Sequence, residues 1–305
     1  MSGMIFRRGL LVLALVAGLA AGAKAQLGAQ GFATPDDASY ALANAIRHDD
    51  EGALASMIGP GWHSLLPRRA DDVAHLRDTF LANWDAQHSS AITPDGNKAV
   101  LQIGVNGWTV PLPLAKEGGT WHFDFDAAKK EILARQIGHN ELTVVQALLA
   151  IGDAQREYAE REALRTGTPQ YARRLMSSPG KKDGLYWETR GGEAPSPLGP
   201  LIARAQPGDG PQNGYYGYHF RLLNSQGPDA RGGAHPYLVN GRMIGGYAVI
   251  AWPVRYGETG VMTFIVNYNS DVYEQDLGPD TPARAAAITI FNPDKGWDKA
   301  DTAPP

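Results

Sequence analysis

Three residues in the first quarter of the chain have side chains suited to acid–base chemistry: His63, Asp71 and His75. Asp71 and His75 are four residues apart, so a helix would place them on one face. A pair of this kind can serve as general acid and base in a hydrolase. The same spacing also fits an exposed ion pair on a helix surface. The pattern therefore leaves two hypotheses, a catalytic pair and a surface ion pair.

A second set of candidates lies in a Lys- and Gly-containing stretch of the C-terminal half. Lys181, Asp183 and Trp187, with Lys182 and Tyr186 beside them, combine charge with an aromatic ring. Such residues would suit the rim of a binding site for a polar ligand. A structured surface loop without a ligand is the alternative.

Oxygen-rich side chains form a third set. Asn267, Asn269 and Asp271 alternate along the chain and precede Glu274, as ligands do in a Ca²⁺ loop. The glycine and the twelfth-position glutamate of an EF-hand are missing. Asparagine side chains also build hairpin turns by bonding to nearby backbone. The run at 48–51 offers a second acidic cluster, and a solvated turn explains it equally. We therefore predict turns at both places, with metal sites as the alternatives.

The composition excludes several classes of protein. The chain has no cysteine, which rules out disulfides, thiolate metal sites and cysteine nucleophiles. It contains no G-x-S-x-G, no phosphate-binding loop and no dinucleotide fingerprint, so no cofactor is predicted. The net charge of −4 gives no basic footprint for nucleic acid or for anionic lipid.

The first 25 residues have the pattern of a signal peptide. Arg7 and Arg8 precede an apolar run at 9–21, and Ala23, Lys24 and Ala25 form a small-x-small cleavage site. The run is shorter than the roughly 20 residues of a membrane-spanning helix. We therefore expect cleavage, a periplasmic or secreted mature protein, and no stable membrane span. A retained anchor is the alternative, and the arginine pair leaves Sec and twin-arginine export both open.

Residues 32–129 are expected to form helices followed by a curved antiparallel sheet. Thr34 before Pro35 indicates a helix start, because Thr favours the N-cap and Pro the first helical position. Apolar spacing predicts further helices over 51–58 and 72–88. Alternating runs with Gly-containing breaks predict strands; they lie at 99–105, 109–114 and 120–125. This order of elements resembles the NTF2-like fold.

One long helix, over 127–164, is expected to join the two halves. Gly138 interrupts it, and a glycine in a helix interior costs about 1 kcal/mol relative to alanine. We therefore predict a kink or a short break there. An apolar stripe follows, formed by Leu142, Val145, Leu148 and Leu149. A polar cluster at the predicted kink suggests hydrogen bonds between domains, with catalysis as the alternative; its members are Arg135, His139, Asn140 and Glu141.

Residues 130–298 are expected to form a second domain, in which the helix packs on a small antiparallel sheet. Strands are predicted over 216–223, 248–254, 260–268 and 271–274, with helical turns at 201–205 and a helix or strand at 283–291. Residues 299–305 are expected to be a disordered tail. The predicted fold class is therefore α+β in both domains.

The second domain resembles the globular domain of type IV pilins. The segments that carry this resemblance are AQREYA, GYHFRLL and AWPVRYGETGVMTFIVNYNSDVYE. A pilin helix begins at the mature N-terminus with an apolar half, whereas this helix is internal and polar at its start. The resemblance therefore concerns the globular domain and does not extend to filament assembly.

The chain as a whole also resembles one family, the bacterial domain of unknown function 2950 proteins. The matching segments lie between residues 32 and 297 and are ARQIGHNEL, DAQREYA, SSPGKKDGLYW, SPLGPLIARA, GYHFRLLNSQGP, GRMIGGYAVIAWP, YGETGVMTFIVN and VYEQDLGPDT. The resemblance implies no activity, cofactor or site.

The leading expectation is an exported, non-enzymatic protein that binds an envelope partner. One alternative is a periplasmic hydrolase that uses the His/Asp pair in the N-terminal cone, the shape expected for the helices and curved sheet of residues 32–129. Another is a carrier that holds a small ligand in that cone. A deep pocket with convergent His and carboxylate groups would favour the enzyme, and a deep apolar pocket would favour the carrier.

Overall fold

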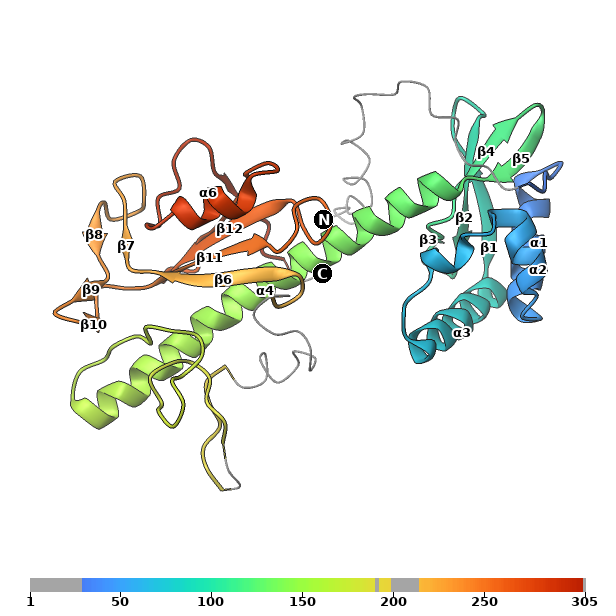
Figure 1. Ribbon diagram of the computed structural model, residues 1–305. Helices are drawn as coiled ribbons and strands as arrows, with labels where there is room; N and C mark the ends of the chain where they lie inside the picture. The colour runs from blue at the N-terminus through green and yellow to red at the C-terminus, as the bar shows by residue number, and fades with distance from the viewer. Residues whose placement is uncertain (1–28, 190–191, 199–213, 304–305) are drawn as a thin grey trace, which may run out of the picture. The chain divides into compact units, whose positions relative to one another are not determined.

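A computed structural model of the chain describes residues 29–189, 192–198 and 214–303 (Figure 1). The chain divides into two units, Met1–Ile132 and Leu133–Pro305, called unit 1 and unit 2 below. Each unit contains helices and antiparallel sheet, so the predicted α+β class is confirmed. The predicted signal peptide at 1–25 and the helical turns predicted at 201–205 lie outside the described residues.

The first two helices of unit 1 begin where local capping signals place them. Helix α1 (Pro35–Arg47) starts with a capping box, in which Thr34 accepts from the Asp37 backbone and Asp37 accepts from Thr34. Helix α2 (Glu51–Ile58) is capped by Asp50 and ends at a glycine with positive φ. A 3₁₀ helix, η1 (Trp62–Leu65), and helix α3 (Ala70–Ala86) follow.

The sheet of unit 1 is antiparallel, with strand order β1-β2-β4-β5 and β3 paired to β2. Its strands are β1 (His88–Ile92), β2 (Lys98–Ile103), β3 (Trp108–Thr109), β4 (Leu114–Glu117) and β5 (Thr120–Phe123). Helix α3 ends two residues earlier than predicted, and β1 was not predicted. The strand predicted at 109–114 is wrong, because Pro111 and Pro113 lack the N–H that pairs in a sheet. The chain instead crosses from β3 to β4 there.

The core of unit 1 lies between one face of this sheet and the helices. Ala99, Leu101 and Ile103 alternate along β2 and are buried, as a sheet with one covered face requires. Phe125 and Ala128, from the first turns of α4, join the same core. The sequence period of two therefore sets which residues line the interior of unit 1.

Helix α4 (Phe125–Thr166) runs without a break through Gly138, so the break predicted there is wrong (Figure 1). Beyond the boundary at Ile132 its buried face packs on the sheet of unit 2; the buried residues include Val144, Val145, Leu148, Ile151 and Tyr158. Leu142, predicted in this stripe, is 39% exposed. Tertiary packing on both sides holds the glycine in the helix against its low propensity.

Unit 2 is built on a five-stranded antiparallel sheet with order β14-β13-β12-β11-β6. The strands are β6 (Tyr218–Leu223), β11 (Ala248–Pro253), β12 (Met262–Asn267), β13 (Val272–Asp276) and β14 (Asp298–Lys299). Helix α4 covers one face and α6 (Thr281–Ala287) the other (Figure 1). Tyr218 and Arg221 are three residues apart on β6, so their side chains lie on opposite faces of the sheet. Tyr218 bonds to Glu141 of α4, and Arg221 donates to carbonyls of α6. Helices on both faces explain why residues 248–251 of β11 are all buried.

Two short hairpins extend unit 2: β7 (Ser225–Gln226) pairs with β8 (His235–Pro236), and β9 (Leu238–Val239) pairs with β10 (Arg242–Met243). Residues 299 and 300, which were expected to belong to a disordered tail, are part of the fold. Lys299 pairs with Tyr273, and Ala300 is buried and donates its N–H to Val272. In the parts of the chain that the structure covers, no helix combines the length and the apolar character needed to cross a membrane.

Candidate functional site

Unit 1 has a cavity of about 500 Å³ between its helices and its sheet, and this cavity is open to solvent on one side. Every side chain that lines it is apolar except four, which are Asp49, Arg77, Thr79 and Asn83. Helices α1, α2 and α3 supply half of the lining residues, and the others come from η1, β2, β3, the segment at 110–112, the start of α4 and the loop residues Asp49 and Leu66. The apolar wall is formed by Leu42, Ile46, Leu54, Ile58, Trp62, Leu65, Leu66, Val73, Leu76, Phe80, Ile103, Trp108, Val110, Pro111, Leu112 and Ile132.

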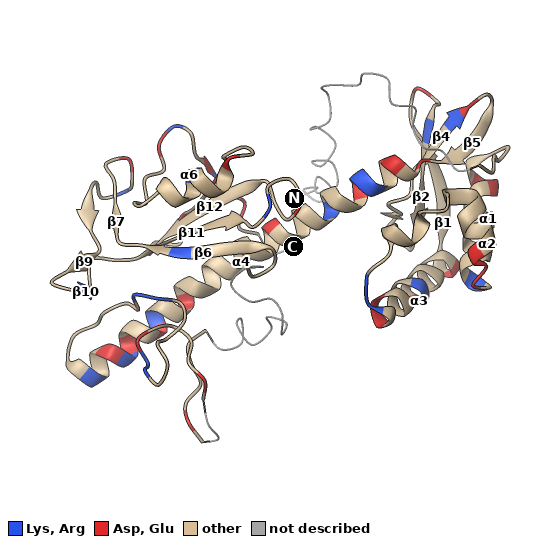
Figure 2. Cartoon of the chain, in the orientation of Figure 1, with Lys and Arg blue, Asp and Glu red and all other residues tan. Residues whose placement is uncertain are grey.

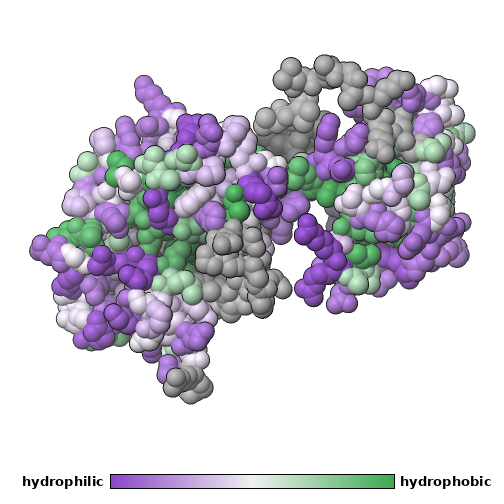
Figure 3. All heavy atoms as spheres, viewed as in Figure 1, coloured by the Kyte–Doolittle hydropathy of each residue, from purple (hydrophilic) through white to green (hydrophobic). Residues whose placement is uncertain are grey.

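The polar groups of this cavity bond mainly to one another. Arg77 forms an ion pair with Asp49 at 2.6 Å, and Asn83 donates to the Thr79 carbonyl at 2.8 Å. Leu76 and Trp108 also line the cavity and are 41% and 48% exposed. Apolar residues are visible on the surface of unit 1 among hydrophilic ones (Figure 3). The wall therefore suits a mostly apolar ligand with one polar end.

The predicted acid–base residues are not in this wall. His63, Asp71 and His75 are all exposed, and none of them lines the cavity. The His63 ring packs on Trp62, with 3.9 Å between ring centroids. Among the described residues no hydrogen bond or ion pair joins Asp71 to His75. The three residues do not converge on a ligand site, and their catalytic role remains only a prediction.

The oxygen-rich stretch after β12 forms a turn. The Asn267 side-chain oxygen accepts the backbone N–H groups of Asn269 at 3.0 Å and Asp271 at 3.2 Å. Asp271 also lies 3.7 Å from the Lys299 ammonium. Within the described ranges no three His, Asp or Glu side chains come together as metal ligands would. The run at 48–51 is likewise engaged in the structure, since Asp50 caps α2 and Asp49 pairs with Arg77.

Unit 2 has a cleft of about 600 Å³ at the C-terminal end of α4. It is lined by Tyr158, Arg161, Glu162, Arg165, Gln170, Tyr171, Arg173, Lys182, Asp183, Trp187, Ala194, Gly241 and Met243. Of the predicted ligand-binding residues, Asp183 and Trp187 line the cleft. Lys181 does not, and its neighbour Lys182 takes that place. Charged residues crowd the last turns of α4 that form this wall (Figure 2).

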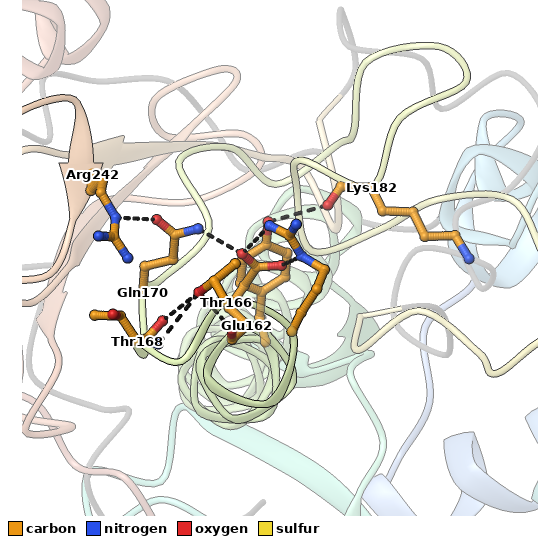
Figure 4. Close-up of polar contacts among 8 residues, drawn as sticks. Glu162, Thr166, Thr168, Gln170, Lys182 and Arg242 are labelled. Atoms are coloured by element: carbon orange, nitrogen blue, oxygen red, sulfur yellow. Dashed lines mark hydrogen bonds and ion pairs between the residues drawn. The ribbon is translucent and has the colours of Figure 1, made fainter.

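A buried carboxylate organises the cleft. Glu162 accepts two hydrogen bonds from Arg165, at 2.8 and 2.7 Å, and one from Gln170 at 2.6 Å (Figure 4). Hydrogen bonding by Arg165 is the largest cause that lowers the pKa of Glu162. Gln170 in turn accepts from Arg242 at 3.1 Å. Burial raises the pKa of Tyr158, whose hydroxyl donates to the Lys182 carbonyl at 3.1 Å. The network fixes α4, the segment after it and the β9–β10 hairpin in one arrangement.

Asp183 is held by the loop that carries it. Its two carboxylate oxygens accept the Ser178 backbone N–H at 2.7 Å and the Ser178 hydroxyl at 2.9 Å. The backbone hydrogen bond is the largest cause that lowers the pKa of Asp183. Arg161 and Lys182 lie over the Trp187 ring, 5.9 and 5.5 Å from its centroid. Two cations therefore lie over the aromatic ring, and each also pairs with a carboxylate, Arg161 with Glu157 and Lys182 with Glu193.

The polar cluster predicted at the kink makes contacts inside unit 2. Asn140 donates to the Thr259 carbonyl at 2.9 Å. Glu141 accepts the backbone N–H groups of Val261 at 2.8 Å and Met262 at 2.9 Å. These bonds join α4 to the start of β12. The predicted hydrogen bonds between two domains are therefore not what these residues form. Their role is to anchor the helix on the sheet.

The sequence interpretation missed the hairpin that completes the cleft. Asn240 and Gly241 both have positive φ at its tip, between paired Val239 and Arg242. An Asn-Gly pair between short apolar strands is the strongest local signal of such a turn, so the hairpin was predictable. Gln170 and Arg242 carry no local pattern, because only the fold brings them to Glu162.

Comparison of the chain with known proteins gives one match. No curated protein and no solved structure matches it, and the NTF2-like and pilin-like resemblances therefore stay predictions. The family described as "Protein of unknown function (DUF2950)" matches residues 29–300. This match covers nearly the whole chain, and the protein belongs to the DUF2950 family.

Proposed function

We propose that the protein is a non-enzymatic binding protein whose unit 1 holds a small, mostly apolar molecule. The observation that carries this proposal is the cavity of about 500 Å³ with its nearly continuous apolar wall. Small-molecule sites typically have volumes of about 300–1,000 Å³ and apolar linings with a few polar groups. The proposal favours the carrier among the alternatives drawn from the sequence.

Burial of the ligand's hydrocarbon supplies the binding energy. Each CH₂ group removed from water contributes about 0.8 kcal/mol. The Arg77–Asp49 pair and Asn83 give one polar region in the wall, which would orient the polar end of the ligand. No reaction is needed for this role, and the exposed His63, Asp71 and His75 do not contribute to the site.

We also propose that this binding takes place outside the cytoplasm. The support is the sequence pattern at residues 1–25, with its arginine pair, apolar run and cleavage site. Binding of a ligand by this protein on behalf of a partner in the cell envelope would take place in the same location. Fractionation of the native host, with the N-terminus of the mature protein sequenced, tests this proposal. Recovery of uncleaved protein from the cytoplasm would contradict it.

Binding can be measured with N-phenyl-1-naphthylamine, a neutral fluorophore that brightens in apolar surroundings. We expect saturable binding to the mature chain and competition by straight-chain 1-alkanols. Each added CH₂ should tighten the competitor about four-fold, the equivalent of about 0.8 kcal/mol, until the cavity is full. Absence of saturable binding, or competition independent of chain length, would rule the proposal out.

A pair of variants locates the site. Val73 is half-buried in the cavity wall, and Val73→Trp should fill the space and weaken probe binding about ten-fold or more. Val105 is 77% exposed and lies outside the wall, so Val105→Trp is the matched control and should bind like the wild type. Equal weakening by both substitutions would place the probe elsewhere. Circular dichroism of both variants checks that they fold.

A further inference from the structure

We propose that the cleft of unit 2 binds a small organic anion, one that carries a carboxylate or phosphate group next to an apolar ring. This site is separate from the cavity of unit 1, and it does not depend on the function proposed for that cavity. Its volume of about 600 Å³ is within the range of small-molecule sites.

The first argument is the charge that the cleft leaves free. Its carboxylates, Glu162 and Asp183, already accept hydrogen bonds from Arg165, Gln170 and Ser178. Protein donors therefore already occupy several of the acceptor sites of both carboxylates. Arg161, Arg173 and Lys182 also line the cleft; Arg161 pairs with Glu157 and Lys182 with Glu193, whereas Arg173 is in none of the ion pairs found among the described residues. The lining therefore carries four cations against two carboxylates, and Arg173 is the cation that is left for an anion in this concave surface.

The second argument is a pair of guanidinium groups at the hairpin end of the cleft: Arg173 lines the cleft, and Arg242, outside the lining, follows Gly241 and is bonded to the lining residue Gln170. Arg173 bonds to the Gly241 carbonyl at 3.3 Å through one terminal nitrogen, Nη1. Arg242 uses Nε for Gln170, and that bond leaves both of its terminal nitrogens in place for another acceptor. Both side chains are exposed and are absent from the ion pairs found among the described residues. Two such guanidinium groups suit bidentate binding of a carboxylate or a phosphate.

The third argument is an indole donor without an acceptor. The Trp187 Nε1 atom is buried, and no atom of the described residues accepts its N–H. Buried donors in folded proteins nearly always have a partner, and a polar ligand atom would supply one here. Tyr158, Tyr171 and Met243 add apolar surface to the same cleft. The ligand therefore needs an acceptor for the indole and an apolar ring besides its anionic group.

The size and charge of the chain indicate a small anion and not a polymer. The net charge of the protein is −4, which opposes binding of a long polyanion. The cations of the cleft are confined to the end of α4, the segment after it and one hairpin. They match one anionic group and not a repeating backbone.

NMR of the full mature chain can test the site directly, because the Trp187 indole N–H gives its own signal, assigned with Trp187→Phe. The probes are phenyl phosphate, benzoate and inorganic phosphate, titrated at one ionic strength set with NaCl. We expect saturable shifts of the Trp187 signal by phenyl phosphate and benzoate. Inorganic phosphate should bind about ten-fold more weakly than phenyl phosphate, because it lacks the ring.

Variants of the two arginines separate this site from general charge attraction. The double substitution Arg173→Gln with Arg242→Gln should weaken phenyl phosphate about ten-fold or more, since both guanidinium groups are lost. Arg173→Lys keeps the charge and should have a smaller effect. Arg255→Gln is the matched control: it is exposed, lies in unit 2 and pairs with Glu258, so binding should be unchanged.

Three results would overturn the proposal: no saturable shift with any probe, equal weakening in the Arg255→Gln control, or unchanged binding in the double variant. Circular dichroism and the dispersion of the backbone amide signals check that all three arginine variants fold. If the double variant does not fold, Arg173→Lys decides the question: weaker binding than in the wild type supports the site, and unchanged binding overturns it. The outcome for this cleft is therefore independent of the outcome for the cavity of unit 1.

Discussion

The side chain of Gln155 pairs with the backbone of Ala172 as a neighbouring strand would. Its Nε2 donates to the Ala172 carbonyl at 3.0 Å, and its Oε1 accepts the Ala172 N–H at 2.8 Å. Gln155 is fully buried, and Ala172 is 1% exposed. The pair fixes the segment at 170–173 on α4, and this segment carries Gln170, Tyr171 and Arg173 into the cleft of unit 2. One buried amide therefore positions residues that no local sequence pattern brings together.

Gln155→Leu should destabilise the protein by about 2–4 kcal/mol. Leucine fills a similar space but leaves both backbone groups of Ala172 buried without a partner, and each such group costs about 1–3 kcal/mol. Urea unfolding followed by circular dichroism measures the change. Gln146→Leu is the control on the same helix, because its bond to the Thr302 carbonyl, at 3.2 Å, is exposed. A loss below about 1 kcal/mol in Gln155→Leu would contradict the assigned role.

Glu162→Gln should lower stability at neutral pH by about 1–2 kcal/mol, since it replaces a charge-assisted bidentate pair with Arg165. The pKa of Glu162 is lowered in the folded state, chiefly by hydrogen bonding from Arg165. Its stabilising effect is therefore complete above the ordinary glutamate pKa and is lost as the pH falls through the lowered value. Denaturation of both proteins between pH 7 and pH 3 should show the two stabilities converging at acid pH. A constant difference would contradict this.

Glu274→Gln should act in the opposite direction. Burial, and then the negative charge of Glu141, raise the pKa of Glu274. A raised pKa in the folded state means that the protein loses stability as the pH rises through the two pKa values. The neutral variant should therefore be the more stable protein at pH 7. This advantage should vanish below the ordinary glutamate pKa, where Glu274 is protonated in both states.

Thermal unfolding at several pH values measures this difference. Glu258→Gln is the control, because Glu258 is an exposed carboxylate of unit 2 whose partner is the exposed Arg255. It should change the melting temperature little at any pH. A lower melting temperature for Glu274→Gln at pH 7 would contradict the prediction.

Local sequence signals predicted the elements whose ends are set by local chemistry. Thr34 and Pro35 marked the first residue of α1, because the cap is a contact between neighbours in sequence. The strands β6, β11, β12 and β13 were predicted within a few residues, since each is an apolar run bounded by turn residues. These features explain why the α+β class followed from the sequence.

The features that the sequence did not predict depend on contacts between distant residues. The cleft needs Glu162, Gln170 and Arg242 together, and a hairpin 70 or more residues away along the chain delivers the last of them. The apolar cavity of unit 1 is defined by what the helices leave unfilled, which a hydrophobic pattern does not encode. Strand β1 was missed because its residues, HSSAI, have little strand propensity and gain their pairing from β2.

Gly138 shows that a single glycine does not end a helix whose flanking turns are packed in a core, and it gives a test by stabilisation. It lies inside α4, and a Cβ atom added there would meet nothing within 4 Å. Gly138→Ala should therefore stabilise the protein by about 0.5–1 kcal/mol, because alanine loses less backbone entropy on entering the helix. Urea unfolding of the variant and the wild type measures the change.

Gly152, on the same helix, is the matched control with the opposite sign. A Cβ atom there would lie 3.1 Å from the hydroxyl of Tyr247, which is buried and donates to the Gly152 carbonyl. Gly152→Ala should therefore lose stability, by about 1–3 kcal/mol for an overpacked core, although the helix propensity gained is the same. The two substitutions differ only in what faces the new methyl group. If Gly138→Ala destabilised the protein as much as Gly152→Ala, α4 would have to bend or open at Gly138, and the continuous helix would be wrong.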